Sequence, residues 1–320
     1  MTDFILQLNS FSLNVLLLIN VIIVKAILAK FIDIKPLFIF SLYCQKLAEK
    51  VNKPQHSAAQ KQLSGFIALT ISILPIAIIL WLFADFIVVP WLWHALLLFI
   101  ALGEFNLSAT SKEIAQALKA KQKHFAREKL SHFVLRDVDK LSIMGLCKAT
   151  IEMQILRYAQ QYFIIACYFI FVSPLAALLL RLLLEMHYCW NRKQPSFFAF
   201  GQAITTTVAL LQWLPIRLFS LIIVISNIGH NFSASLTAFN QHFFQLNNDI
   251  ILAVFALSID RQLSGVAMYE QQKLRKMSFN SLAEPPSIND ITITSKIIKQ
   301  ISYFCLTLTI ILSITISFLY

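Results

Sequence analysis

Long runs without a charged residue dominate this sequence and restrict the folds that it can adopt. Five such runs, and a sixth that only Arg217 interrupts, recur along the 320 residues, each close to the ~20 apolar residues that a helix needs to cross a bilayer. A backbone polar group inside lipid has no water to bond, so an apolar run is stable there only as a helix. We therefore predict transmembrane helices over six segments: 4–24, 65–84, 86–102, 162–180, 200–226 and 302–320.

The composition agrees with a membrane protein. Only 13% of the residues are charged and 58% are hydrophobic, whereas a soluble domain carries roughly 25% charged residues. The excess of 27 Lys and Arg over 16 Asp and Glu gives a formal charge of +11, which would fit a nucleic acid or the anionic face of a membrane. The hydrophobicity favours the lipid bilayer as the partner, and we expect no nucleic acid.

The basic residues gather in three polar stretches between the apolar runs. Stretches 25–64, 103–161 and 217–301 hold 24 of the 27 Lys and Arg residues, and basic loops tend to stay on the cytoplasmic side. Six spans with the N-terminus outside place all three stretches on that side. We therefore predict one all-α domain over residues 1–320, a polytopic helical bundle with amphipathic cytoplasmic helices in the bacterial cytoplasmic (inner) membrane.

The middle polar stretch is predicted to be helical over 104–160. Thr110 and Glu113 have the spacing of a capping box, and apolar residues after them recur on one face. We expect this segment to lie against the membrane or to pack on the bundle. Two prolines, Pro75 and Pro174, fall inside predicted spans, where neighbouring helices can pair the carbonyl that a proline frees.

Common nucleotide and metal motifs are missing from the sequence. With six glycines in the chain, neither a P-loop nor a dinucleotide-binding glycine motif can be written. The five cysteines form no C-x-x-C pair and have no histidine beside them at metal-ligand spacing. The sequence therefore predicts no metal site.

Two places in the chain carry candidate site residues. Arg136, Asp137 and Glu152 belong to the densest polar cluster, which fits either a salt-bridged cytoplasmic helix or a binding site. Arg217 follows Pro215 in an apolar run. If the span continues past it, Arg217 faces a cavity or a partner. If the span ends just before it, Arg217 is an interfacial anchor.

Short motifs follow one another in a specific order along nearly the whole chain. In chain order they are Lys35-Pro36, Leu47-Ala48-Glu49-Lys50, Arg136-Asp137, Lys148-Ala149, Ile151-Glu152, Pro215-Ile216-Arg217-Leu218, Arg261-Gln262-Leu263-Ser264-Gly265 and Asn289-Asp290-Ile291. Each is weak alone. Together and in this order they resemble the CobD/CbiB family of cobalamin-biosynthesis membrane proteins.

This resemblance implies an activity and a set of ligands. In the family, aminopropanol or its phosphate is joined by an amide bond to a side-chain carboxylate of adenosylcobyric acid, with ATP and Mg²⁺, to make adenosylcobinamide phosphate. The resemblance therefore implies a corrinoid substrate. It makes Arg136, Asp137, Glu152 and Arg217 candidates for binding substrate or phosphate, and it assigns no catalytic residue.

Several acidic positions of the family are not acidic here. Where the family has Ala-Glu-Asn and then Asp, this chain has Ile155-Leu156-Arg157 and Gln160, and another acidic element falls on the apolar run around 182–186. Holding Mg²⁺ and phosphate during amide formation requires charged groups. The alternative is a non-catalytic membrane signalling or assembly protein resembling AmpE, a more distant relative, with other membrane proteins as partners.

Overall fold

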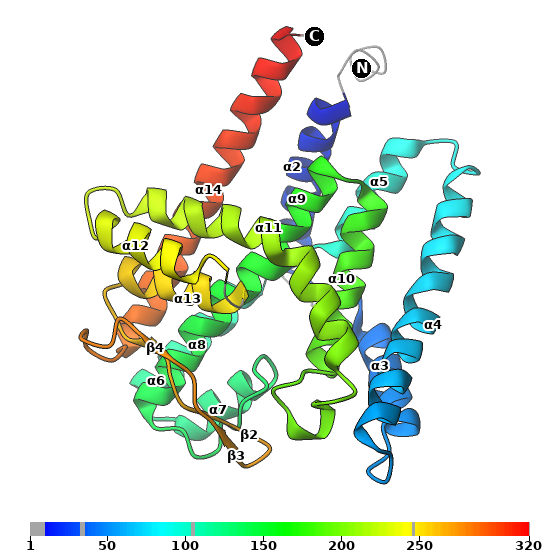
Figure 1. The fold of residues 1–320 in the computed structure, drawn as a ribbon. Coiled ribbons are helices and arrows are strands. Elements are labelled where there is room, and N and C mark those ends of the chain that lie inside the picture. Colours follow the sequence, from blue (N-terminus) through cyan, green and yellow to red (C-terminus); the bar gives the residue numbers. More distant parts are fainter. Residues whose placement is uncertain (1–9, 33–35, 104–105, 245–246, 320) are drawn as a thin grey trace.

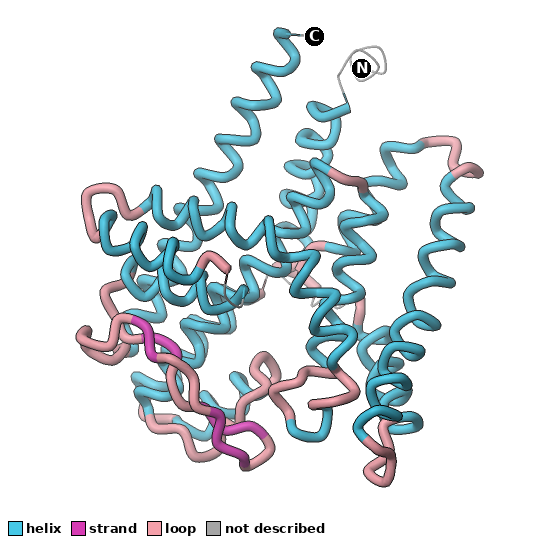
Figure 2. The backbone as a smooth tube through the Cα atoms, viewed as in Figure 1, coloured by secondary structure: helices cyan, strands magenta, loops and turns pink. Residues whose placement is uncertain are grey.

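The computed structural model describes residues 10–32, 36–103, 106–244 and 247–319, and this part of the chain is mostly helical (Figure 1). Its strands form two short antiparallel ladders, β1 with β4 and β2 with β3 (Figure 2). The predicted all-α class is confirmed. The helices are α2 (Ser10–Leu28), α3 (Phe38–Val51), α4 (Ala58–Ala84), α5 (Pro90–Ala101), α6 (Leu107–Lys119), α7 (Lys123–Ser131), α8 (Ile143–Tyr158), α9 (Ile164–Phe171), α10 (Pro174–Cys189), α11 (Gln202–Ser226), α12 (Phe232–His242), α13 (Asn247–Ser258) and α14 (Ile288–Leu319), and the strands are β1 (Leu263–Ser264), β2 (Ala267–Tyr269), β3 (Gln272–Leu274) and β4 (Ser278–Phe279).

Four helices of the described chain are long and apolar enough to cross a membrane: α2, α4, α11 and α14. They correspond to the predicted spans 4–24, 65–84, 200–226 and 302–320, of which residues 4–9 and 320 lie outside the described part. α4 begins earlier than predicted because Ser57 and Gln60 form a capping box. The Ser57 hydroxyl accepts from the Gln60 N–H at 3.2 Å, and the Gln60 side chain accepts from the Ser57 N–H at 2.9 Å.

The predicted spans 86–102 and 162–180 are wrong as single helices of membrane length. α5 covers only 12 residues, with Pro90 in its first turn. The run 162–180 is divided, because α8, a π-helical turn (Ala159–Phe163) and α9 lead to Phe171, and α10 starts afresh at Pro174. Ser173 caps α10 by accepting from the Ala176 N–H at 3.0 Å. Pro174 therefore starts a helix, since the first position needs no N–H.

The break between α9 and α10 changes where the loop after α10 lies. An alternation of six spans would put residues 181–199 opposite the three basic stretches. In the structure the loop after α10 contacts two of those stretches, because the Asn52 amide donates to the Ser196 carbonyl at 3.0 Å and the Ser196 N–H donates to the Glu270 carboxylate at 3.0 Å. The start of α2 and the end of α14 lie together at the other end of the molecule (Figure 1), where the Ser12 and Ser317 hydroxyls are 2.8 Å apart.

The stretch 104–160 folds as α6, α7 and α8 rather than as one helix, and residues 104 and 105 lie outside the described part. The predicted capping box is wrong. α6 begins at Leu107, so the Thr110 hydroxyl lies in its first turn and donates to the Asn106 carbonyl at 3.0 Å. The fully buried Ile114 lies on the apolar face of α6, and α6 packs against α7, α8 and α14. Of the two predicted locations, this segment takes the one on the bundle.

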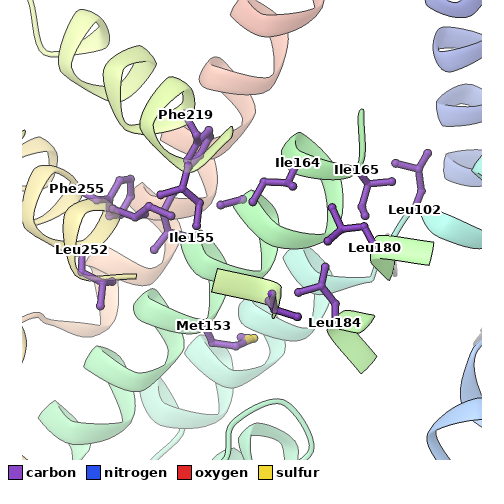
Figure 3. Close-up of a cluster of buried hydrophobic side chains, with 14 of the residues drawn as sticks. Leu102, Met153, Ile155, Ile164, Ile165, Leu180, Leu184, Phe219, Leu252 and Phe255 are labelled. Carbon is purple, nitrogen blue, oxygen red and sulfur yellow. The ribbon is translucent and has the colours of Figure 1, made fainter. Parts of the chain in front are cut away.

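The core forms where α8, α9, α10, α11 and α13 meet. Its side chains interdigitate from all five helices and fix α8 and α10 relative to each other (Figure 3). Members that are at most 2% exposed include Ile155, Ile164, Leu180, Phe219 and Phe255. α8 and α10 then carry polar side chains beyond this core.

Candidate functional site

A cavity of about 940 Å³ opens beside this core, between α3, α8, α10, the loop after α7 and the loop after α10. Its size lies within the ~300–1,000 Å³ typical of small-molecule sites. The wall carries more basic than acidic groups, which favours an anionic ligand. The basic residues are Arg136, Arg157, Arg181, Lys193 and Lys276, and the acidic ones are Glu49, Glu152 and Glu185.

Glu152 is the buried anchor of this wall. It projects from α8, a helix that Ser142 caps by accepting from the Gly145 N–H at 3.2 Å. One Glu152 carboxylate oxygen pairs with Arg136, and the other accepts from the Ser264 N–H at 2.7 Å. The carboxylate thereby joins α8, the loop after α7 and strand β1. Because both oxygens are bonded, the carboxylate and the guanidinium beside it are held in one orientation.

Asp137 lies next to Arg136 in the chain but does not line the cavity. Its carboxylate accepts from the Gln271 N–H at 2.8 Å, and its own N–H donates to the Met268 carbonyl at 2.9 Å. Both partners belong to the β2–β3 hairpin (Ala267–Leu274). The structure therefore brings Arg136 and Glu152 together as one ion pair. Asp137 instead bonds to the β2–β3 hairpin and holds it in place.

Arg217 lies inside α11 and is also outside the cavity wall. The helix continues past it to Ser226 and is long and apolar enough to cross a membrane, which favours the interpretation in which the span continues past Arg217. Its Nε and Nη2 donate to the Phe243 carbonyl at 2.9 and 2.6 Å, its Nη1 donates to the Asn247 side chain, and its guanidinium stacks on the Trp213 ring at 4.6 Å. Arg217 thereby ties the end of α12 and the start of α13 to α11.

A second ion pair in the cavity wall was not predicted. Arg181 and Glu185 lie one turn apart on α10, with 2.6 Å between nitrogen and oxygen, and their side chains are 6% and 16% exposed. In the sequence, Arg181 only closes a predicted span, and Glu185 falls within the run around 182–186 that the sequence reading treats as apolar. The i, i+4 spacing of opposite charges was the available signal, because charges within an apolar helix usually face a cavity or a partner.

The π-helical turn between α8 and α9 presents Gln160 to the cavity. The Gln160 amide accepts from the Tyr188 hydroxyl at 2.8 Å and donates to the Asn248 side chain at 3.2 Å. Just before the turn, the Arg157 guanidinium stacks on the Phe133 and Tyr188 rings at 5.2 and 5.1 Å. Single π-helical turns inside α-helices are frequent at functional sites. Here the turn links α10 and α13 to α8 through one buried amide.

Lys193 and Lys276 complete the basic wall from two loops that lie far apart in the sequence. Both side chains are half-buried, and the Lys276 ammonium lies 5.7 Å from the centre of the Tyr269 ring. Within the described residues neither lysine is ion-paired with a carboxylate. Burial first, and then the charge of Lys276, lowers the pKa of Lys193 to about 7.

The carboxylates of the cavity do not fit a resident divalent cation. Among the described residues, no group of three or more His, Cys, Asp and Glu side chains could hold a metal ion. Arginines already engage Glu152 and Glu185, and the Glu49 carboxylate pairs with Lys46 at 2.9 Å. A Mg²⁺ site needs carboxylate oxygens that are free to bind the ion. The arrangement is better suited to anions.

Comparison with known proteins identifies a family over most of the chain. The family described as CobD/Cbib protein matches residues 18–298. Among curated relatives, the cobalamin biosynthesis protein CobD of Stutzerimonas stutzeri is 27% identical over 175 residues, which cover 54% of this chain and 58% of the relative. Proteins with the same name from Chromobacterium violaceum and Leptospira interrogans are 25% identical over 192 residues (58% of this chain, 61% of the relative) and 27% identical over 193 residues (59% and 61%). The chain thus spans about three fifths of the length of the curated relatives that it matches. No solved structure matches it.

Proposed function

Because the chain belongs to the CobD/CbiB family of cobalamin-biosynthesis proteins, we propose that it catalyses the amide-forming step that this family implies. In this proposal ATP activates a side-chain carboxylate of adenosylcobyric acid, and the amine of aminopropanol or of its phosphate forms an amide bond with it. The observation that carries the proposal is the cavity. Arg136 and Glu152, which match the family's central motifs, lie together in its wall.

ATP, the corrinoid carboxylate and the phosphate of aminopropanol phosphate carry negative charge, and the wall is basic. A guanidinium can donate two parallel hydrogen bonds to a carboxylate or phosphate, so Arg136 binds one of these groups in the proposal. Glu152 is a positioning residue: it fixes the direction of Arg136 through their ion pair and is itself fixed by the Ser264 N–H. The pair therefore presents a pre-oriented cation to the cavity.

ATP binding in this proposal relies on cationic side chains. Arg181, Lys193 and Lys276 share the wall with Arg136 and are available to phosphate oxygens. Because the cavity carboxylates are engaged, a Mg²⁺ ion would enter with the nucleotide phosphates instead of occupying a cage of protein ligands.

We further propose that the protein resides in the bacterial inner membrane with the cavity toward the cytoplasm. All three basic stretches contribute to the cavity wall, through α3, through the region from the end of α7 to α8, and through the segment after α12. Basic segments tend to remain in the cytoplasm. This orientation gives the cavity access to cytoplasmic ATP.

A non-catalytic role of the AmpE type is the second candidate. It is favoured by two positions at which the family has acidic residues and this chain does not. Leu156 and Gln160 stand at these positions in the cavity wall, and Gln160 is bonded to Tyr188 and Asn248. Neither side chain can exchange a proton near neutral pH, and a leucine cannot bind a cation. In this role the cavity binds a ligand and the protein acts through membrane protein partners.

A growth assay separates the two candidates. A bacterial strain that lacks its own synthase is supplied with cobyric acid and complemented with the wild-type gene or a variant. Rescue by the wild type that is lost in Glu152→Ala and in Arg136→Gln, at equal protein levels in the membrane, supports the synthase. Glu113→Ala is the matched control, because Glu113 forms an exposed ion pair with Lys129 away from the cavity. Failure of the well-expressed wild type to rescue growth would reject the synthase in favour of the second candidate.

A further inference from the structure

Two lysines meet in the cavity wall although they come from different parts of the chain. Lys193 belongs to the loop after α10, and Lys276 follows β3. Both line the cavity, and their side chains lie within contact of each other. Two ammonium groups in contact repel each other. The fold therefore brings together two like charges that would separate if both side chains were free.

Hydrogen bonds around the two lysines hold the segments that carry them together. In the loop, the Lys193 N–H donates to the Asn191 side chain at 3.0 Å. The loop is joined to the β2–β3 hairpin by Glu270, whose carboxylate accepts from the Ser196 N–H at 3.0 Å and from the Ser196 hydroxyl at 2.5 Å. Asp137 holds the same hairpin by accepting from the Gln271 N–H. The contact between the lysines is thus imposed by neutral and acidic groups around it.

The charges that face Lys193 leave an excess of positive charge. Lys276 and Arg136 oppose its protonation, and Asp249 at the start of α13 favours it. Asp249 does not line the cavity, and Glu152, which does, is already bonded to Arg136 and to Ser264. On the cavity side, Lys193, Lys276 and Arg136 therefore converge. Glu152, a carboxylate that lines the cavity with them, is already bonded.

We propose that Lys193 and Lys276, together with Arg136, form a binding site for a phosphoryl group. A phosphate dianion offers several strong acceptor oxygens to the two ammonium groups and to the guanidinium, and it removes the repulsion between them. The proposal deepens the function above, and it rests on that function only for the source of the phosphoryl group, either a nucleotide or a phosphorylated amine.

Binding of a dianion has a further consequence for Lys193. A negative charge beside a lysine favours its protonated form. Above neutral pH the empty site holds Lys193 largely without its proton, because its pKa is about 7. Phosphate binding at pH 8 is therefore accompanied by uptake of a proton.

Calorimetric titration of the full-length protein in lipid nanodiscs with inorganic phosphate at pH 8 tests the site. Lys193→Met and Lys276→Met each remove an amino group that can bind phosphate in its charged form, and they keep an unbranched side chain. Each should weaken phosphate binding about tenfold or more, since a hydrogen bond to a charged group is lost. Lys273→Met is the control on the same hairpin, because Lys273 is exposed and does not line the cavity. Its affinity should stay within about twofold of wild type. Titration in buffers of different ionisation enthalpy should show proton uptake that disappears in Lys193→Met.

Competition identifies the source of the phosphoryl group. Displacement of phosphate by ATP supports the site and assigns it to the nucleotide, and displacement by aminopropanol phosphate supports it and assigns it to the amine. No phosphate binding by the wild type, or equal binding by wild type and both methionine variants, overturns the proposal. If phosphate binding depends on both lysines but growth is not rescued, the synthase fails and the site stands. If growth is rescued but both variants bind phosphate as well as wild type does, the synthase stands and the phosphoryl site fails.

Discussion

α4 and α10 are both apolar helices, but their surroundings differ. α4 exposes Ile71 and Trp81 at 62% and 65%, and it contributes nothing to the cavity. α10 packs against α3, α4, α5, α9 and α11, and it carries Arg181 and Glu185 into the cavity wall. Neighbouring helices let α10 hold an ion pair that would be costly against lipid. In this fold the candidate chemistry lies on short inner helices, and the long apolar helix α4 belongs to an outer shell around them.

The backbone shows the same contrast. α4 continues through Pro75 without a break, whereas the inner rod of α8 and α9 contains a π-helical turn and stops before Ser173. Irregular backbone within a membrane protein is tolerated where protein or a polar cavity can satisfy the freed groups. The Gln160 amide on the π-helical turn illustrates this, since its partners are side chains from α10 and α13.

The largest expected effect is an all-or-none one and concerns the loop after α10. In a background without the five native cysteines, we expect Ser196→Cys to resist an impermeant thiol reagent in intact cells and to react after permeabilisation, as Lys121→Cys should. Val88→Cys is the control for the opposite face, because Val88 is 94% exposed in the turn between α4 and α5 (Figure 1). Labelling of Ser196→Cys in intact cells, with Lys121→Cys protected, would restore the alternation of six spans.

The next effect measures the inner ion pair. Glu152→Ala removes the partner of a buried arginine and should lower the free energy of unfolding by about 3–5 kcal/mol, since the guanidinium is left without its counter-charge. The measurement is denaturant unfolding in detergent micelles. Arg136→Met and the double variant complete a thermodynamic cycle, in which the double variant should lose less than the sum of the single variants. Strictly additive losses would show that the two side chains do not interact.

Arg217→Met should separate a structural arginine from a ligand-binding one. Its hydrogen bonds to the Phe243 carbonyl connect α11 to the end of α12, and their loss should reduce the free energy of unfolding by about 1.5–3 kcal/mol. Phosphate affinity should not change, because Arg217 does not line the cavity. Weaker phosphate binding at unchanged stability would instead place Arg217 at the ligand.

The outer shell could be predicted from the sequence to a greater extent than the cavity. α4 follows from an uninterrupted apolar run, because burial in lipid is a property of one segment alone. The break before Pro174 had a local signal in Ser173, a capping residue followed by a proline, but hydropathy alone favours a continuous span across it. The family's motif order predicted Arg136, Asp137 and Glu152 as one cluster, of which the structure pairs Arg136 with Glu152 and bonds Asp137 to Gln271. Arg181 with Glu185 was missed within an apolar run.

The two lysines could not have been paired from the sequence. Lys193 and Lys276 meet only because Glu270 bonds to Ser196 and Asp137 bonds to Gln271. These bonds join a loop and a hairpin that no local pattern connects. The contacts of Arg217 could not be predicted for a similar reason, since a buried arginine in an apolar run fits both a ligand and a carbonyl of a neighbouring helix. Only the position of Phe243 decides between them.

The pH dependence of phosphate binding should give a smaller effect, of about tenfold per pH unit above pH 7, or ~1.4 kcal/mol. Between pH 7 and the ordinary lysine value, folded Lys193 is largely neutral and the unfolded residue is charged. The unfolded state therefore binds more protons, and this residue's contribution to the free energy of unfolding rises with pH. Phosphate affinity falls over the same range, because the complex needs the charged lysine. Titrations at pH 8 and 9 should show this fall in wild type and lose it in Lys193→Met, which retains the titration of phosphate itself. An equal pH dependence in both proteins would remove Lys193 from the site.

The smallest expected effect tests the outer side of the comparison. Ile71→Ala on α4 should change the free energy of unfolding in lipid bicelles by less than about 0.5 kcal/mol. The reason is that the Ile71 side chain is exposed on the folded protein and meets lipid before and after unfolding within the membrane. Ile155→Ala is the matched inner variant, and it should lose ~2–5 kcal/mol because it leaves a cavity in the core (Figure 3). SDS-driven unfolding in bicelles measures both. A loss above ~1 kcal/mol in Ile71→Ala would show that protein, not lipid, covers this face of α4, and would end the distinction between a lipid-facing shell and a packed interior.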